Sequence, residues 1–105
     1  MKGAKEWKGL FYNKIDYSDR YEISYMGEIR NKKTKQIRKQ TISRNYQKIV
    51  ILSHGKPVTI KIHRAVAENF LLNEDLSLQV NHIDGNKLNN YYKNLEWCTI
   101  KRDVS

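Results

Sequence analysis

The chain has 105 residues, and its 20 Lys and Arg side chains against 11 Asp and Glu give a net charge of +9. A hydrophobic fraction of 39% allows one compact domain with a small core, and no stretch comes near the roughly 18 consecutive apolar residues of a membrane-spanning helix. The single cysteine, Cys98, excludes an internal disulfide and a cysteine-based zinc site. Because the first residues contain no apolar run, we expect no secretory signal and a soluble protein of a reducing compartment.

The charges are distributed unevenly along the chain. Residues 1–64 carry sixteen basic and five acidic side chains, whereas residues 65–105 carry four and six. Between Glu28 and Glu68 there are eleven Lys or Arg and no carboxylate. Solvated surfaces usually mix both signs, so this run indicates a polyanionic partner, of which nucleic acid is the commonest. A basic surface without a partner remains the alternative, and an anionic membrane is disfavoured because the run is not an amphipathic helix.

The N-terminal third is predicted to be a small, tyrosine-rich β unit. Residues 21–24 and 28–31 read as two short strands joined by a turn at Met26-Gly27. Large side chains surround them, and we expect most to form the core of this unit rather than to stack on bases: Trp7, Leu10, Phe11, Tyr12, Tyr17, Tyr21, Ile23 and Tyr25.

Residues 32–48 are the most basic stretch, with polar Thr, Gln, Ser and Asn side chains between the cations. Such side chains suit contacts with phosphates and base edges, although a solvated loop has the same composition. We therefore predict that residues 1–48 form a DNA-contacting segment whose candidate contacts are Arg30, Lys32, Lys33, Lys35, Arg38, Lys39, Arg44 and Lys48.

The middle of the chain predicts a hairpin followed by a helix. Residues 47–52 and 58–62 read as its strands, because Val58, Ile60 and Ile62 alternate with polar residues, and residues 53–56 form the turn. His54 is expected to be a solvated turn residue. His63 then opens a short helix whose apolar residues recur at helical spacing.

A second hairpin is expected near the C-terminal end. Residues 78–82 and 95–99 read as strands, and the Asn-rich segment between them favours turns that bond their own backbone. A further helix would begin at Ile100, with Thr99 as its N-cap. Strand, loop, strand and helix outline a ββα unit that can hold one metal ion between strand end and helix.

His82, at the end of the first of these strands, is the candidate reactive group. An imidazole side chain suits general-base work, and Asn81, Asp84 and Asp103 offer oxygen ligands for a hard cation. An EF-hand is excluded, because the positions after Asp84 lack the required glycine and the final glutamate. The scattered histidines make a poor zinc site. A lone histidine in a turn-rich hairpin is more often structural than catalytic.

Three segments resemble the HNH endonucleases of phages and introns. They are VNHIDGNKLNN at residues 80–90 with NLEWCT at 94–99, IHRAVAENF at 62–70, and YEISYMGEIR at 21–30 with EWK at 6–8. The last resembles the modular segment that these homing enzymes carry before the nuclease unit. The resemblance implies an α+β fold of small antiparallel β-hairpins and a short helix, in which residues 49–105 form the ββα-metal (HNH) unit.

The resemblance also implies roles for individual residues. His82 would be the general base that activates water, and Asn94 would bond across the loop to orient it. Asn81, where many relatives carry Asp, and Asp103 would bind one Mg²⁺ or Mn²⁺ ion. The substrate would be double-stranded DNA, cut or nicked in the cytoplasm of the bacterial host if a phage encodes the protein. The alternative is a catalytically inactive DNA-binding protein on the same scaffold, and an RNA-binding or protein-interaction role is a third.

Overall fold

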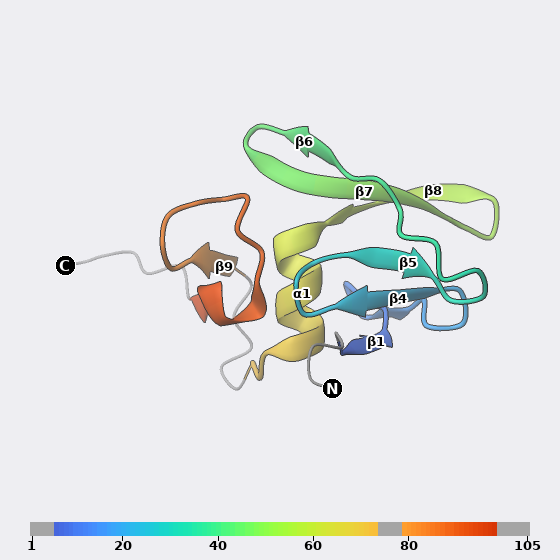
Figure 1. Cartoon of the computed structure of the whole chain (residues 1–105), viewed down its shortest axis with the longest axis horizontal. Helices are drawn as coiled ribbons and strands as arrows, with labels where there is room; N and C mark the ends of the chain where they lie inside the picture. The colour runs from blue at the N-terminus through green and yellow to red at the C-terminus, as the bar shows by residue number, and fades with distance from the viewer. Residues whose placement is uncertain (1–5, 74–78, 99–105) are drawn as a thin grey trace.

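The structure is a computed structural model that describes residues 6–73 and 79–98 (Figure 1). Within these ranges small antiparallel sheets surround one α-helix, α1 (Ile62–Phe70), and one turn of 3₁₀ helix, η1 (Tyr92–Asn94), precedes the last strand. The strands are β1 (Trp7–Gly9), β2 (Phe11–Tyr12), β3 (Ile15–Asp16), β4 (Tyr21–Ser24), β5 (Ile29–Asn31), β6 (Thr41–Ser43), β7 (Tyr46–Ser53), β8 (Lys56–Lys61), β9 (Gln79–His82) and β10 (Leu95–Cys98). No described helix is both long and apolar enough to cross a membrane.

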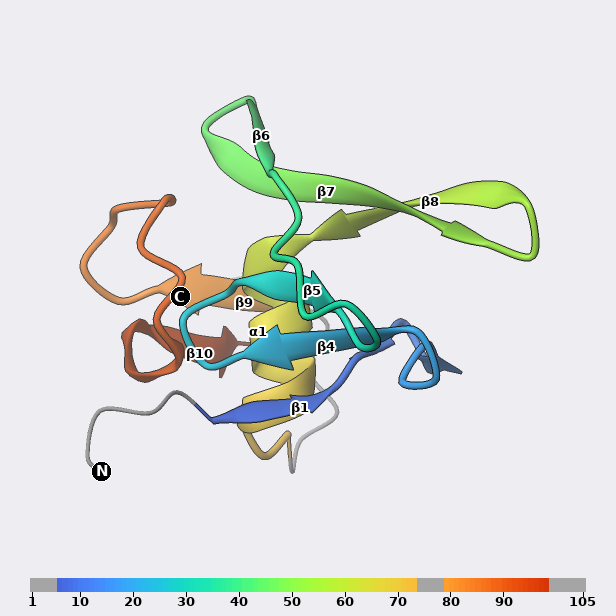
Figure 2. The same cartoon turned by 45° about the vertical axis from the view of Figure 1, so that its right-hand side comes forward.

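The strands form four antiparallel sheets, with orders β1-β4-β5, β2-β3, β6-β7-β8 and β9-β10. Figures 1 and 2 show α1 in the middle of the molecule, with β4 and β5 on one side, the β9–β10 hairpin on another and the long β7–β8 hairpin at its N-terminal end. Contacts of α1 with strands of every one of these sheets make the helix the centre of the fold.

Packing holds α1 in place, since its own sequence provides little stabilisation. Nine residues make a marginal helix in water, and Lys61 at the N-cap provides no side-chain hydrogen bond. The buried face of the helix consists of Ile62, Ala65, Val66 and Ala67. A fully buried Ile or Val side chain stabilises a fold by about 1.5–3 kcal/mol, so this face accounts for the position of the helix.

One hydrophobic core joins the two predicted segments of the chain. Its fully buried members come from both sides of residue 48: Leu10, Ile23, Ile29, Ile51, Ile60, Ile62, Ala65 and Val66. The boundary placed between residues 48 and 49 lies inside β7. Two further contacts connect the N-terminal unit to the Asn-rich loop. Tyr92 donates its N–H to the carbonyl of Tyr25 at 2.9 Å, and Gly27 lies against Ile62 and Asn90.

The predicted strands and the first helix are confirmed, and within the described residues their ends agree with the prediction to within two residues. Strands β4 and β5 flank the turn at Met26-Gly27, and β9 pairs with β10 in the expected hairpin. The β7–β8 turn tightens to His54 and Gly55, both at positive φ, and His54 is exposed there as expected. Tyr17 and Tyr21 are core residues. The helix expected from Ile100 lies outside the described residues.

Residues 32–48 differ from a simple basic loop. They contain β6, which pairs with β7 through a two-residue turn at Arg44 and Asn45, both with positive φ. Positive φ at both central residues is the signature of a type I′ hairpin turn, which normally selects Asn-Gly. Because Arg44 occupies the first central position, the sequence lacks the Asn-Gly pair that would have predicted this turn. The basic segment therefore extends the sheet that carries β7 and β8.

Candidate functional site

His82 is the last residue of β9, where its pairing with Leu95 of β10 fixes the backbone. Its side chain is only 6% exposed. The ring Nε2 lies 2.9 Å from the side-chain oxygen of Asn90, which is itself 4% exposed. The Asn90 amide in turn donates to Gln47 Oε1 at 2.9 Å. A short chain of buried polar groups thus connects β7, the Asn-rich loop and the end of β9.

A second histidine, His63 of α1, lies beside His82. Their ring centroids are 5.3 Å apart, and the ring of Tyr46 stacks on His63 at 4.8 Å with an interplanar angle of 27°. Burial, with smaller contributions from the neighbouring His82, Lys61 and Arg64, lowers the pKa of His63 to about 4. His63 is therefore neutral at physiological pH. The sequence analysis placed it at the helix start without a role.

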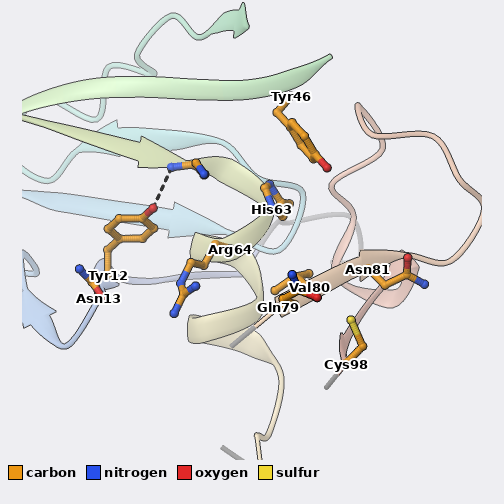
Figure 3. Close-up of a pocket in the computed structure, with 10 residues that line it drawn as sticks. Tyr12, Asn13, Tyr46, His63, Arg64, Gln79, Val80, Asn81 and Cys98 are labelled. Atoms are coloured by element: carbon orange, nitrogen blue, oxygen red, sulfur yellow. Dashed lines mark hydrogen bonds between the residues drawn. The ribbon is translucent and has the colours of Figure 1, made fainter. Parts of the chain in front are cut away.

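A cleft of about 520 Å³ opens beside the rings of Tyr46 and His63 (Figure 3). Figure 3 shows Tyr46 and His63 on one wall and Asn81 and Cys98 of the β9–β10 hairpin on another. Lys61 and Arg64 also line it, and the described residues of its lining include no carboxylate. Two cations at the wall of a cleft attract anions such as phosphate groups.

Arg64 is held at the cleft by defined contacts. Its Nε donates to Glu68 Oε2 at 2.7 Å, one helical turn further on, and its guanidinium lies 5.9 Å from the ring centre of Trp97. The other Glu68 oxygen accepts the N–H of Asn13. The sequence analysis missed this arginine as a site residue, because helical spacing alone does not show which face of α1 borders the hairpin.

Asn94, expected to orient His82, closes the Asn-rich loop instead of touching the imidazole. Its amide nitrogen donates to the Asp84 carboxylate at 2.9 Å and to the Asn89 carbonyl at 3.0 Å, while its oxygen accepts the Asp84 N–H at 3.1 Å. The direct partner of His82 is Asn90, which the sequence analysis did not single out. The run of asparagines indicates that an amide side chain contacts His82. The sequence does not show which asparagine it is, because that depends on the path of the loop.

Asp84 is part of this closure as well. Its carboxylate accepts hydrogen bonds from the side chain of Asn89, the N–H of Asn86 and the side chain of Asn94, and these hold its pKa below the usual value. Both oxygens are thus engaged within the loop, at 2.8–2.9 Å. Asp84 therefore serves as the internal anchor of the loop.

The expected metal ligands are only partly within the described residues. Asn81 is exposed beside the cleft, and its amide nitrogen donates to Glu96 Oε2 at 2.8 Å across the β9–β10 pair. That bond fixes the orientation of the amide, whose oxygen suits a hard cation. Asp103 lies outside the described residues. Within residues 6–73 and 79–98, no group of three or more His, Cys, Asp or Glu side chains could hold an ion.

Three of the candidate DNA contacts also support the fold. The guanidinium of Arg30 lies 3.9 Å from the ring centre of Trp7, and its Nε donates to Glu22 at 2.8 Å. Lys35 lies 3.3 Å from the same carboxylate. Arg38 donates to the Tyr21 hydroxyl and to the carbonyl of residue 50.

The remaining candidate contacts have no ion pair within the described part of the chain. Lys32, Lys33, Lys39 and Arg44 are exposed. Lys48 of β7 lies directly opposite Lys61 of β8. Like charges placed opposite each other in a sheet are destabilising, so an anion between this pair would relieve their repulsion. Lys61 also lines the cleft, and the pair thus connects the outer face of the β6-β7-β8 sheet to the candidate site.

Comparisons with known proteins agree with this picture. Residues 61–104 match the HNH endonuclease family. The chain is 36% identical over 100 residues to the DNA endonuclease I-HmuI of Bacillus phage SP01, covering 94% of this chain and 55% of that protein. It is 38% identical over 94 residues to an uncharacterized HNH endonuclease of Acanthamoeba polyphaga mimivirus, covering 90% of this chain and 28% of that protein. The chain thus spans about half of the first relative and about a quarter of the second.

The fold comparison gives the same result. A solved structure that describes DNA binding and cleavage by the HNH homing endonuclease I-HmuI matches with a TM-score of 0.77 and 36% identity, over 90% of this chain and 52% of that one. The predicted α+β fold of small antiparallel hairpins and a helix is therefore confirmed. The match of residues 61–104 to the HNH endonuclease family, the relatives and the fold thus agree that this chain is similar to HNH endonucleases.

Proposed function

We propose that this chain is a metal-dependent DNA endonuclease, in which His82 is the general base for hydrolysis of a phosphodiester bond. The observation that carries the proposal is the buried contact between His82 and Asn90, near a cleft that Lys61 and Arg64 line. A base must be held in one orientation and one protonation state to accept a proton from a positioned water. The contact with Asn90 fixes the orientation of the imidazole, as a base directed at a bound water requires.

The orientation of Asn90 assigns the roles of the two ring nitrogens. Its amide nitrogen is used by Gln47, so it presents its carbonyl oxygen to His82 Nε2. An oxygen acceptor requires a proton on Nε2, which leaves Nδ1 as the basic nitrogen. In the proposed reaction Nδ1 takes a proton from the attacking water. Lys61 and Arg64 bind non-bridging phosphate oxygens across the cleft and neutralise charge that grows as the bond breaks.

One Mg²⁺ or Mn²⁺ ion is part of the proposal. Asn81 and Asp103 would hold it, the first through its amide oxygen and the second through its carboxylate. When bound, such an ion acts as a Lewis acid towards the phosphate and the leaving oxygen. The hydrogen bond from Asn81 to Glu96 supports Asn81 as a metal ligand, because it fixes the orientation of the amide.

Double-stranded DNA is the proposed substrate. I-HmuI, whose fold this chain shares, is described as a DNA-binding and DNA-cleaving homing endonuclease. The exposed cations of the basic segment, and the Lys48–Lys61 pair that leads into the cleft, support a phosphate backbone as the ligand.

The test is cleavage of supercoiled plasmid by the purified chain with Mg²⁺ or Mn²⁺, compared with chelator and with His82→Ala. We expect nicked or linear product from wild type only, and His54→Ala, in an exposed turn far from the cleft, is the control that should cut normally. Absence of cleavage with any divalent metal, together with retardation of DNA in a gel, would favour the catalytically inactive DNA-binding alternative. The observation that favours this alternative is the uncharged Asn81, which stands where many relatives carry a charged Asp.

A further inference from the structure

The rings of Tyr46, His63 and His82 form one cluster built from three separate elements. Tyr46 begins β7, His63 is in the first turn of α1 and His82 ends β9. The three ring centroids form a triangle: His63 lies 4.8 Å from Tyr46 and 5.3 Å from His82, and Tyr46 lies 6.1 Å from His82. Flat rings at these separations are in van der Waals contact.

The other side of His82 is fixed by the amide chain already described. Gln47, next to Tyr46 in β7, accepts from Asn90, and Asn90 contacts His82 Nε2. Two neighbouring residues of one strand thus approach His82 in different ways, Gln47 through the Asn90 amide and Tyr46 through ring contacts with both His63 and His82. Because β7 is a central strand of its sheet, both sets of contacts are anchored to the same rigid element.

The surroundings of His63 keep its ring uncharged. Its Nδ1 is buried and has no hydrogen-bond partner among the described residues. An imidazolium there would leave a buried N–H without an acceptor, which disfavours the charged form. Burial and the neighbouring His82, Lys61 and Arg64 lower the pKa of His63 to about 4. An uncharged ring can pack against His82 whether or not His82 carries a proton, because no like-charge repulsion arises.

We propose that His63 is a positioning residue for His82: its ring holds the His82 imidazole against Asn90 and so keeps the proton of the neutral imidazole on Nε2. This inference rests on the proposed function for its consequence in catalysis, but the geometry itself predicts an effect on the His82 ring. With a smaller side chain at position 63, the imidazole would gain space to rotate away from Asn90. It would then lose the acceptor that selects its tautomer.

The experiment compares His63→Ala, which removes the ring, with His63→Phe, which keeps a flat uncharged ring of similar size. The first measurement is the tautomer of His82 in ¹⁵N-labelled protein, read from two-bond ¹H–¹⁵N correlations at pH 8. His82 signals are assigned with His82→Ala, and His54→Ala is the matched control. Plasmid cleavage under saturating DNA and DNA affinity by gel retardation are measured on the same variants. His63→Leu, bulky but not flat, replaces His63→Ala if the latter does not fold.

We expect wild type and His63→Phe to show a single Nε2–H tautomer at His82, and His63→Ala to show averaged tautomers. Misplacement of a catalytic group by about 1 Å can cost on the order of 100-fold in rate. We therefore expect kcat to fall at least 10-fold in His63→Ala, to recover in His63→Phe, and DNA affinity to stay within about 2-fold of wild type.

Three outcomes would overturn the inference. One is an unchanged tautomer and kcat in His63→Ala, and another is an unchanged tautomer with lost cleavage in His63→Phe, which would mean that His63 takes part in the chemistry itself. The third is averaged tautomers in wild type. If wild type does not cut DNA but the tautomers follow the expected pattern, the proposed function fails and the positioning role of His63 stands.

Discussion

His82 and Asn90 are joined by a 2.9 Å contact between imidazole Nε2 and amide oxygen, and both side chains are almost completely buried. Their positions are eight residues apart in the sequence, at the end of β9 and near the far end of the loop that follows it. Buried polar groups that lack a partner cost about 1–3 kcal/mol each. The contact therefore links the stability of the loop to the orientation of the candidate base.

The first prediction removes Asn90. In Asn90→Ala, His82 Nε2 loses its acceptor and Gln47 loses its donor, so we expect plasmid cleavage to fall about 10- to 100-fold and stability to fall by about 1–3 kcal/mol. Cleavage rates and urea unfolding measure the two effects. Adding Asn90→Ala to His82→Ala should cause little further loss of cleavage, because residues that act as a unit are not additive. A further large loss in the double variant would mean that Asn90 acts independently of His82.

The second prediction concerns the pH dependence of the loop. Hydrogen bonds from Asn89, Asn86 and Asn94 hold the pKa of Asp84 below the ordinary value of an aspartate. A carboxylate whose pKa is lowered by folding stabilises the folded state fully above its unfolded pKa, and this contribution is lost as the pH falls through the folded pKa. We therefore expect Asp84→Asn to be less stable than wild type at pH 7 and the difference to shrink towards pH 3. Urea unfolding at several pH values checks this, and a pH-independent difference would contradict it.

Much of the fold could be predicted from the sequence because its signals are local. The alternation of apolar residues defines the β7–β8 hairpin, and helical spacing after His63 defines α1. Strand β6 was not predicted from the sequence, because it is only three residues long and its turn has Arg44-Asn45 in place of the usual Asn-Gly. Short strands are set by pairing with a neighbour, which no local pattern contains.

The candidate site was predictable in its centre and not in its surroundings. His82 and Asn81 stand in a distinctive loop sequence, so their importance could be inferred from the chain alone. The place of Asn90 at the site depends on the path of the loop, and that of His63 depends on which face of α1 lies towards β9. Both follow from tertiary packing, since residues far apart in sequence meet only after the core has formed. Asp103 stays a prediction because it lies outside the described residues.

The third prediction concerns Gly27, in the turn between β4 and β5. Its φ of +92° is one that L side chains rarely adopt, and an added Cβ would lie 2.9 Å from Ile62 Cγ2 and 3.2 Å from Asn90 Cβ. We expect Gly27→Ala to lower stability by about 1–3 kcal/mol through backbone strain and crowding. Thermal unfolding measures the loss. Gly55→Ala is the matched control, since it shares the positive φ but meets no atom within 4 Å. If both variants lose the same stability, the contact with Ile62 and Asn90 has no measurable effect.

The fourth prediction separates cations that bind DNA from cations that support the fold. Lys39 and Arg44 are exposed, whereas Arg30 stacks on Trp7 and pairs with Glu22. Each lost phosphate contact flattens the dependence of log affinity on log salt by about one unit. We expect the double variant Lys39→Ala/Arg44→Ala to reduce the salt slope by about two units with unchanged unfolding.

Arg30→Ala is the contrast to that double variant, because it also removes positive charge. It should lower stability by about 1 kcal/mol or more, since it removes a cation–π contact and a half-buried ion pair. DNA retardation at several salt concentrations and urea unfolding distinguish the two cases. An unchanged salt slope in the double variant would show that the exposed end of the basic segment does not touch DNA, and the phosphate contacts would then have to come from the Lys48–Lys61 pair and the cleft that it borders.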